Sequence, residues 1–340
     1  MIKPALGKFV PLKKLCSDSN HFQMLAVDQR PPIFNIISAA KNREHRYEEV
    51  VECKQLITAN LSHLATAILM DPYYSIPNLL SYNNSKGLIV TLEDHDFEET
   101  NRGRYSKNIN NWTVEKIKKL GADAVKVLAW YRPDAERESV DHQKIYIQTI
   151  GQQCEKYNLP FLLELLVYPF QDDIHHTKEY QEQIQKNTEH VIDSVKEFAK
   201  EKYKVDIFKL ESPVDSAKLE NNITLETESA FQKLSQATNN KPWVMLSSGM
   251  GKDSFYNCLR LAYKYGASGY LAGRTIWLEP FQSYPDIEKV DRGLKTSSLN
   301  YIKKLNDLTV NNAKSLDTFF SNGYKIDKPK QFTADYQGFK

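Results

Sequence analysis

Two lysines and one glutamate lie within apolar segments of this sequence, where such residues can carry chemistry. Lys209 occurs in VDIFKLESP, Lys126 in DAVKVLAW and Glu164 in PFLLELLVYP. A lysine removed from water loses its proton more readily than an exposed one, and a second cation nearby strengthens this effect. The free amine is a nucleophile that forms a Schiff base with ketones and aldehydes. A glutamate beside it can carry the protons that the reaction requires.

Each of these residues also has a purely structural interpretation. A strand lysine taken in isolation more often extends its amine to an acid near the strand end. Lys126 could serve only as a salt-bridge partner of Glu164, because ion-pair networks also perturb buried groups. Glu164 could serve only to neutralise a lysine, since buried glutamates are rare unless paired. For Glu164 the two roles are compatible, and the sequence leaves both open.

Polar residues also follow other apolar runs. Asp28, Gln29 and Arg30 end the run MLAVDQR. We expect Asp28 to contact a substrate hydroxyl, and Gln29 or Arg30 to contact a distal anion; the alternative for Asp28 is an N-cap of the next helix. Glu93 and Asp94 could in principle hold magnesium. The eight histidines lack a ligand-like arrangement, so the prediction is an enzyme without metal.

The last two apolar runs end in small residues and an arginine. LSSGM contains Ser247, Ser248 and Gly249, and AGRTIW contains Gly273 and Arg274. Backbone N–H groups exposed by glycine, together with an arginine, form the recurrent phosphate site after the last two strands of barrels. Either motif alone indicates only a turn. Together they predict an anion site.

Short apolar runs of strand type must position these residues. Eight of them occur, at Phe22–Val27, Ala65–Met70, Gly87–Leu92, Ala122–Ala129, Phe161–Leu166, Val205–Leu210, Trp243–Leu246 and Ser268–Ala272. Helical periodicity separates most of them, and Gly121 and Gly266 are placed to end two of the helices. This alternation predicts a closed parallel (β/α)8 TIM barrel rather than an open sheet with a G-x-G-x-x-G turn.

The extent of the barrel follows from the same pattern. We expect one domain over residues 1–340, with a barrel core at about 20–290, a helical N-terminal extension and a polar helical tail at 291–340.

The composition excludes several classes of protein. With 41% hydrophobic and 26% charged residues, the chain is typical of a globular protein with a large core. A net charge of +2 spread along the chain gives no footprint for nucleic acid or an anionic membrane. The four scattered cysteines and the lack of a signal peptide or a long apolar span predict reduced thiols and a cytoplasmic location.

Six motifs carry a resemblance to a known family. MLAVDQR, ADAVKVL, FLLELL, FKLESP, WVMLSSG and GASGYLAGRTIW resemble, in order and spacing, class I tagatose-1,6-bisphosphate aldolases and the related sulfofructose-phosphate aldolases, from about Phe22 to Trp277. That family forms a (β/α)8 barrel and cleaves ketose phosphates to dihydroxyacetone phosphate and an aldehyde, without metal or another cofactor. Such barrels commonly assemble as homo-oligomers, so we expect a dimer or tetramer.

The resemblance also implies roles for particular residues. Lys209 forms the Schiff base, Lys126 and Glu164 assist it, and Asp28 contacts the reacting sugar. The segments Ser248-Gly249 and Gly273-Arg274 hold the phosphate of the dihydroxyacetone end. The polar stretch EDHDFEETNRGR after the third run and the tail beyond Asp291 match neither branch of the family well.

The leading hypothesis is therefore an aldolase that cleaves a ketose 1,6-bisphosphate, with tagatose 1,6-bisphosphate as the first choice, to dihydroxyacetone phosphate and glyceraldehyde 3-phosphate. One alternative is an aldolase for sulfofructose 1-phosphate. Another uses the lysines as acid–base groups in isomerisation or decarboxylation, without a covalent intermediate. A third is a sugar-phosphate sensor with weak turnover. In each case the partner is a small sugar phosphate.

Overall fold

The computed structural model describes residues 6–82, 85–178, 183, 185–219, 223–320, 329–336 and 338. Eight parallel strands form a closed barrel in the order β1-β10-β9-β8-β7-β6-β3-β2. They are β1 (Phe22–Ala26), β2 (Ala67–Met70), β3 (Gly87–Thr91), β6 (Ala124–Trp130), β7 (Phe161–Leu166), β8 (Ile207–Leu210), β9 (Trp243–Met245) and β10 (Gly269–Ala272). Each predicted run overlaps one of these strands, β6 extending one residue beyond its run to Trp130, and the predicted TIM barrel is confirmed.

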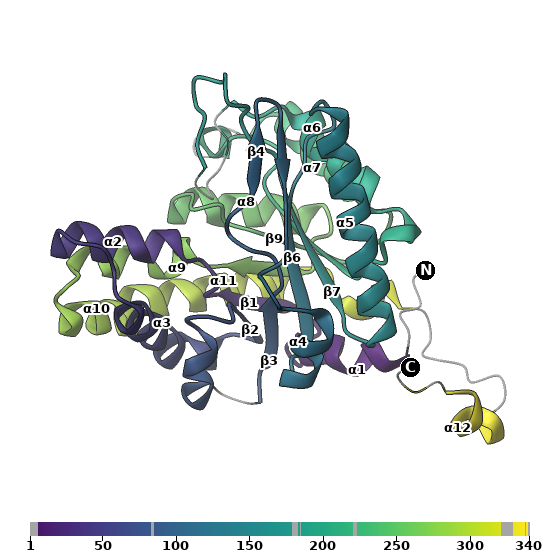
Figure 1. Cartoon of the computed structure of the whole chain (residues 1–340), viewed down its shortest axis with the longest axis horizontal. Helices are drawn as coiled ribbons and strands as arrows, with labels where there is room; N and C mark the ends of the chain where they lie inside the picture. Colours follow the sequence, from purple (N-terminus) through teal and green to yellow (C-terminus); the bar gives the residue numbers. More distant parts are fainter. Residues whose placement is uncertain are drawn as a thin grey trace.

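The α-helices of the described residues lie mostly around the outside of the barrel, and the last of them lies away from it (Figure 1). In chain order they are α1 (Leu6–Lys14), α2 (Pro31–Lys41), α3 (Tyr47–Leu61), α4 (Val114–Leu120), α5 (Arg137–Lys156), α6 (Thr188–Phe198), α7 (Leu225–Ala237), α8 (Lys252–Lys264), α9 (Arg274–Trp277), α10 (Ile287–Gly293), α11 (Leu299–Asn312) and α12 (Phe332–Asp335). As predicted, α4 ends at Gly121, whose φ of 93° is the left-handed conformation that glycine adopts easily.

The barrel strands are apolar throughout because both of their faces are covered. Outward-facing side chains pack with the helices in the largest core cluster, which includes Val125, Leu163 and Phe208. Inward-facing side chains such as Met24, Leu162 and Val244 form a second cluster inside the barrel. This burial on both faces explains why each strand reads as a continuous apolar run rather than as an alternating one.

Segments from both ends of the chain close the lower end of the barrel. Leu12 and Leu15, in and just after α1, and Leu316, after α11, belong to the inner cluster. Lys8 on α1 also forms a buried ion pair with Asp206, at 2.8 Å. In Figure 1, α1 lies at the lower end of the barrel and β4 at the upper end.

Three features differ from the simple strand–helix alternation. Strands β2 and β3 are joined by a 3-10 segment, Ile76–Ser81, instead of a long helix. A small antiparallel hairpin, β4 (Glu98–Thr100) and β5 (Gly103–Tyr105), follows β3 within the polar stretch that matched neither branch of the family. The segment assigned to a polar tail also carries core residues, since Leu294, Ile302 and Leu305 are 0% exposed.

A buried ion pair fixes the end of β1. Lys54 on α3 pairs with Asp71, which follows β2, and both side chains are 0% exposed. Lys54 Nζ also donates to the backbone oxygen of Val27 at 2.7 Å. The polar residue at the end of the second predicted strand is therefore structural, and it holds the backbone immediately before Asp28.

None of the helices described is long and apolar enough to span a membrane.

Candidate active site

The three charged residues that interrupt the apolar runs meet inside the barrel. Glu164 on β7 lies opposite Lys209 on β8 in the strand register, and its Oε2 accepts a hydrogen bond from Lys209 Nζ at 2.9 Å. The same oxygen lies 2.9 Å from Lys126 Nζ. The lysine side chains are 2% exposed and that of Glu164 is 0% exposed. One carboxylate therefore bridges two buried lysines.

Lys126 contacts two further carboxylates. Its Nζ lies 3.0 Å from Asp28 Oδ2 and 2.5 Å from Glu93 Oε1. Burial lowers the pKa of Lys126, but the attraction of Asp28, Glu164 and Glu93 outweighs it and holds the pKa well above its ordinary value. Lys126 is therefore a cation at neutral pH. The interpretation of Lys126 as a salt-bridge partner of Glu164 alone is therefore incomplete.

Lys209 is held differently. Among the described residues its ammonium group has one carboxylate partner, Glu164, which it shares with Lys126. Because two other carboxylates neutralise Lys126, the pair of lysines is asymmetric. Of the two, Lys209 is the lysine whose deprotonation disturbs fewer ion pairs.

The pKa values of Asp28 and Glu93 shift in opposite directions in this environment. Burial raises the pKa of Asp28, but Lys126 and Lys209 more than offset it and lower the pKa to about 2. Burial also raises the pKa of Glu93, and there the attraction of Lys126 and the hydrogen bond from Thr91 do not overcome it. Asp28 is thus a carboxylate at neutral pH. It does not cap the next helix, because Arg30 occupies the N-cap position of α2.

The ends of β9 and β10 form a narrow, polar corner. Ser248 and Gly249 have φ values of 46° and 82°, so the chain turns sharply after β9. A Cβ on Gly249 would lie 3.3 Å from Arg274 Cζ, which places the guanidinium group against this turn. Ser247 and Ser248 are buried. The predicted residues of the anion site are therefore assembled in one place.

Gln29 belongs to the same corner. A Cβ on Gly273 would lie 2.7 Å from the backbone oxygen of Ala26 and 2.9 Å from Gln29 Nε2, so only glycine fits where β10 meets the end of β1. From the sequence we expected Gln29 or Arg30 to contact the distal anion of the substrate. In the structure Gln29 lies against Gly273, the neighbour of Arg274, and it also lines the pocket at the mouth of the barrel.

Arg30 lines a pocket at the mouth of the barrel. The pocket has a volume of about 60 Å³, and its lining residues are Asp28, Gln29, Arg30, Pro31, Pro32, Glu93, Asp94, His95, Lys126, Leu128, Trp130 and Lys178. Lys126 faces the pocket directly, and Glu164 connects Lys126 to Lys209. The network formed by Lys126, Glu164 and Lys209 is therefore continuous with the pocket at the mouth of the barrel.

Some residues of the site did not emerge as such from the sequence. Glu93 stood at a strand end but was considered only for magnesium with Asp94; instead it contacts Lys126. Lys178 lies in a polar segment without periodicity, so no pattern indicated that it lines the pocket. Glu211 shares a strand face with Lys209, but it contacts Lys186 Nζ at 3.0 Å and accepts a hydrogen bond from Val167 N.

One group of possible metal ligands occurs in the described part of the chain. The ligand atoms of Asp94, His95 and Asp96 lie within 4.8 Å of one another. Glu93, Asp94 and His95 all line the mouth pocket, and Glu93 also contacts Lys126. Of the two acids considered for magnesium, Glu93 thus pairs with a lysine, whereas Asp94 lies near His95 and Asp96.

A closed barrel with two lysines and three carboxylates at its centre is suited to an enzyme that uses a buried amine, and comparison with known proteins gives the family. The family model described as DeoC/LacD family aldolase matches residues 22–279. The chain therefore belongs to the DeoC/LacD aldolase family and is a lyase.

Two relatives show the similarity in sequence. The chain is 32% identical to tagatose 1,6-diphosphate aldolase 2 of Enterococcus faecalis over 328 residues, which is 93% of this chain and 97% of the relative. It is 29% identical to tagatose 1,6-diphosphate aldolase of Streptococcus pneumoniae, over 91% of this chain and 97% of the relative.

Solved structures share the fold. A fructose-bisphosphate aldolase from Plasmodium falciparum matches with a TM-score of 0.65 and 12% identity, over 92% of this chain and 98% of that one. An archaeal fructose 1,6-bisphosphate aldolase matches with a TM-score of 0.57 and 16% identity, over 89% and 99%. At these identities the likeness concerns the barrel fold alone.

Proposed function

We propose that this protein is a class I aldolase in which Lys209 forms a Schiff base with a ketose 1,6-bisphosphate. The observation that carries the proposal is the asymmetric lysine pair, in which Lys126 contacts three carboxylates and Lys209 contacts only the shared Glu164 among the described residues. A free amine on Lys209 is a nucleophile for the ketone carbon of the substrate.

The substrate is proposed to be tagatose 1,6-bisphosphate, cleaved to dihydroxyacetone phosphate and glyceraldehyde 3-phosphate. This choice is supported by the relatives named tagatose 1,6-diphosphate aldolase. The corner formed by Ser248, Gly249, Gly273 and Arg274 would hold the phosphate of the dihydroxyacetone end, since backbone N–H groups and a guanidinium group suit a phosphate.

The reaction begins with attack of Lys209 Nζ on the ketone carbon, C2. The resulting carbinolamine takes up a proton, loses water and becomes an iminium ion, and Glu164 is placed to carry the proton. A base then removes the proton of the C4 hydroxyl, and the C3–C4 bond breaks. Its electrons move through C2 to nitrogen, which leaves an enamine and releases glyceraldehyde 3-phosphate.

The second half returns the enzyme to its starting state. Protonation of C3 restores the iminium ion, and water hydrolyses it to dihydroxyacetone phosphate and the free amine. Asp28 is ionised at neutral pH and so can accept a hydrogen bond from a substrate hydroxyl. In this scheme the iminium nitrogen is the electron sink, so no metal or other cofactor is required.

We also propose that the protein acts in the cytoplasm as a homodimer or homotetramer, without nucleic-acid or membrane partners. The nearly balanced net charge supports the part of this proposal that concerns nucleic acid and membranes. The homo-oligomer is proposed because barrels of this kind commonly associate.

Reductive trapping tests the mechanism. Borohydride added with dihydroxyacetone phosphate should produce a stable adduct, which peptide mass mapping should locate on Lys209 and not on Lys126. Lys241→Met provides a matched control, because Lys241 is also a buried lysine, 2% exposed and paired with Glu201, but lies before β9 at the other end of the strands. This variant should still give the adduct on Lys209.

Several results would count against the proposal. Absence of an adduct on Lys209 with the ligand bound contradicts Schiff-base chemistry, as does activity that survives Lys209→Ala. Loss of activity with a chelator and its return with metal contradicts the metal-independent scheme. An adduct without measurable turnover of any ketose phosphate would favour a sensor, and turnover of sulfofructose 1-phosphate alone would reassign the substrate.

A further inference from the structure

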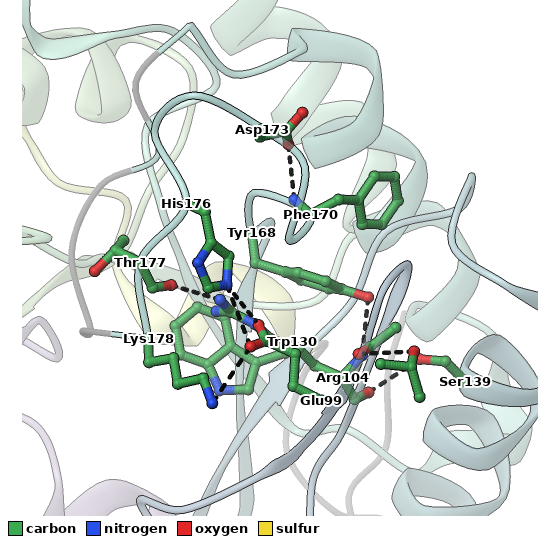
Figure 2. Close-up of polar contacts among 12 residues, drawn as sticks. Glu99, Arg104, Trp130, Ser139, Tyr168, Phe170, Asp173, His176, Thr177 and Lys178 are labelled. Carbon is green, nitrogen blue, oxygen red and sulfur yellow. Dashed lines mark hydrogen bonds and ion pairs between the residues drawn. The ribbon is translucent and has the colours of Figure 1, made fainter.

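A buried arginine joins several segments at the mouth of the barrel (Figure 2). Arg104, on strand β5 of the hairpin, is 0% exposed. Its guanidinium carbon lies 4.5, 4.7 and 4.8 Å from the ring centroids of Phe97, Trp130 and Tyr168. Aromatic faces attract a cation, so these rings and the guanidinium group hold one another in place.

The polar contacts of Arg104 extend this connection. Its Nε donates to Glu99 Oε1 at 2.8 Å, and its Nη2 donates to the backbone oxygen of Thr177 at 2.5 Å. Its backbone N–H donates to the Tyr168 hydroxyl, and its backbone oxygen accepts from the Ser139 hydroxyl. The hairpin is thereby joined to the ends of β6 and β7, to α5, and to the segment that follows β7.

Glu99 brings a lysine to this cluster. His176 Nε2 lies 3.2 Å from Glu99, and Lys178 Nζ lies 3.7 Å from it (Figure 2). Burial raises the pKa of Glu99, but the hydrogen bonds from His176 and Arg104 outweigh it and keep the carboxyl ionised. Arg104 is the nearest cation to Glu99, and the side chain of Lys178 is 70% exposed. Lys178 is therefore held loosely and remains accessible to a ligand.

Lys178 and Arg30 line the same pocket. Lys178 reaches it beside Glu99 of the hairpin, and Arg30 reaches it from the end of β1, with its Nη1 3.9 Å from Asp94 Oδ1. The corner containing Ser248 and Arg274 follows β9 and β10, which lie across the ring from β3 and β6. The arginine cluster, with its hairpin after β3 and Trp130 on β6, thus faces that corner across the mouth.

We propose that Lys178 and Arg30 form the subsite for the anion at the end of the substrate remote from Arg274, and that Arg104 is the positioning residue that holds Lys178 there. The ligand group is a tetrahedral oxyanion, a phosphate or a sulfonate, which two cations that line one pocket can bind together. This inference rests on the proposed function, and it makes Lys178 a determinant of substrate specificity.

The test compares substrates with and without the distal anion. The kcat/KM values for tagatose 1,6-bisphosphate and tagatose 1-phosphate are measured for the wild type and for Lys178→Met. The ratio of the two values should fall about tenfold, as expected for the loss of one charge-assisted hydrogen bond. Lys196→Met is the matched control, because Lys196 is an exposed lysine on α6 that pairs with Asp193; its ratio should equal that of the wild type.

Arg104→Lys tests the positioning role. Lysine retains the charge but lacks the planar fork that bonds Glu99 and Thr177 together, so the same ratio should fall. Adding Lys178→Met to this variant should cause little further decrease, since both changes act through the same amine. Glu99→Gln gives a second test should Arg104→Lys not fold, and its ratio should fall as well.

The outcomes separate this inference from the proposed function. A wild type that cleaves no ketose phosphate contradicts both. If the wild type prefers the bisphosphate and Lys178→Met preserves that preference, only the distal subsite is wrong. Additive losses in the double variant would show that Arg104 acts independently of Lys178. A third substrate, sulfofructose 1-phosphate, identifies the distal anion: the substrate whose kcat/KM falls more in Lys178→Met carries the group that this subsite binds.

Discussion

At the scale of single residues, the central feature is one carboxylate oxygen shared by two lysines. Glu164 Oε2 lies 2.9 Å from both Lys126 Nζ and Lys209 Nζ. Burying charges is costly unless they are paired, and Asp28 and Glu93 complete the pairing of Lys126. The same network that makes these buried charges tolerable therefore also distinguishes the two lysines. Stability and chemistry should depend on overlapping residues here.

Asp28 provides a test of this network through pH. Its pKa of about 2 lies below the ordinary value of 3.8, so the folded protein binds this proton less readily than the unfolded chain. The stabilisation is complete above about pH 4 and is lost as the pH falls towards 2, and the difference in pKa corresponds to about 2 kcal/mol. Asp28→Asn should remove this contribution.

The measurement is the free energy of unfolding of wild type and Asp28→Asn between pH 2 and pH 6. The wild type should be more stable by about 2 kcal/mol at pH 6, and the gap should close towards pH 2. Asp307→Asn is the control, because Asp307 is an exposed aspartate on α11; this variant should follow the wild type. A gap that does not change with pH would contradict the ionised, paired state of Asp28.

At the scale of elements, closure of the barrel depends on the contact between its first and last strands. Gly269 on β10 lies opposite Phe22 on β1 in the register. Its φ is 153°, and a Cβ at this position would lie 1.9 Å from the backbone oxygen of Phe22. No side chain fits there without separation of the two strands. One residue without a side chain therefore permits the ring to close.

Gly269→Ala should consequently destabilise the protein by about 3 kcal/mol or more, because the new methyl group meets rigid backbone on the neighbouring strand. Gly121→Ala is the matched comparison: Gly121 also has a positive φ, 93°, but its Cβ would meet no heavy atom within 4 Å. That variant should lose only about 1 kcal/mol through backbone strain. Chemical unfolding of both variants measures the difference, and equal losses would rule out the steric explanation.

The elements also show what the sequence could predict. Each barrel strand is covered on both faces, so its apolar run was visible without knowledge of its neighbours. Consecutive strands β6, β7 and β8 are adjacent, which is why Lys126, Glu164 and Lys209 were expected in one pocket. The hairpin β4–β5 was not predicted, because its two three-residue strands are polar and depend on tertiary contacts of Arg104.

Tertiary contacts also explain why the sequence did not predict some residues at the mouth of the barrel. Lys178 lies beside Glu99, and the residue before it, Thr177, accepts a hydrogen bond from Arg104, a contact between segments more than seventy residues apart. Lys54 likewise pairs with Asp71 across two elements. Local patterns carry no information on such contacts. The sequence thus predicted the charged residues within the barrel strands and missed those that depend on contacts between distant segments.

At the scale of the whole molecule, the two ends of the barrel have separate tasks. The lysine network and the pocket lie towards the carboxyl ends of the strands. The lower end is filled by apolar side chains, including Leu12 and Leu316 from opposite ends of the sequence. Barrels commonly divide chemistry and stability in this way. Substitutions at the lower end should therefore affect stability alone, whereas those in the lysine network can affect both activity and stability.

Leu316→Ala tests this division. Leu316 is 0% exposed within the inner cluster, so truncation should leave a cavity and destabilise the protein by roughly 2–5 kcal/mol. Its kcat and KM for tagatose 1,6-bisphosphate, measured well below the unfolding temperature, should equal those of the wild type. Lys209→Ala should show the reverse, with activity lost and the fold retained. Leu225→Ala, at a position 87% exposed, should change neither property, whereas an altered KM in folded Leu316→Ala would mean that packing at the lower end shapes the site.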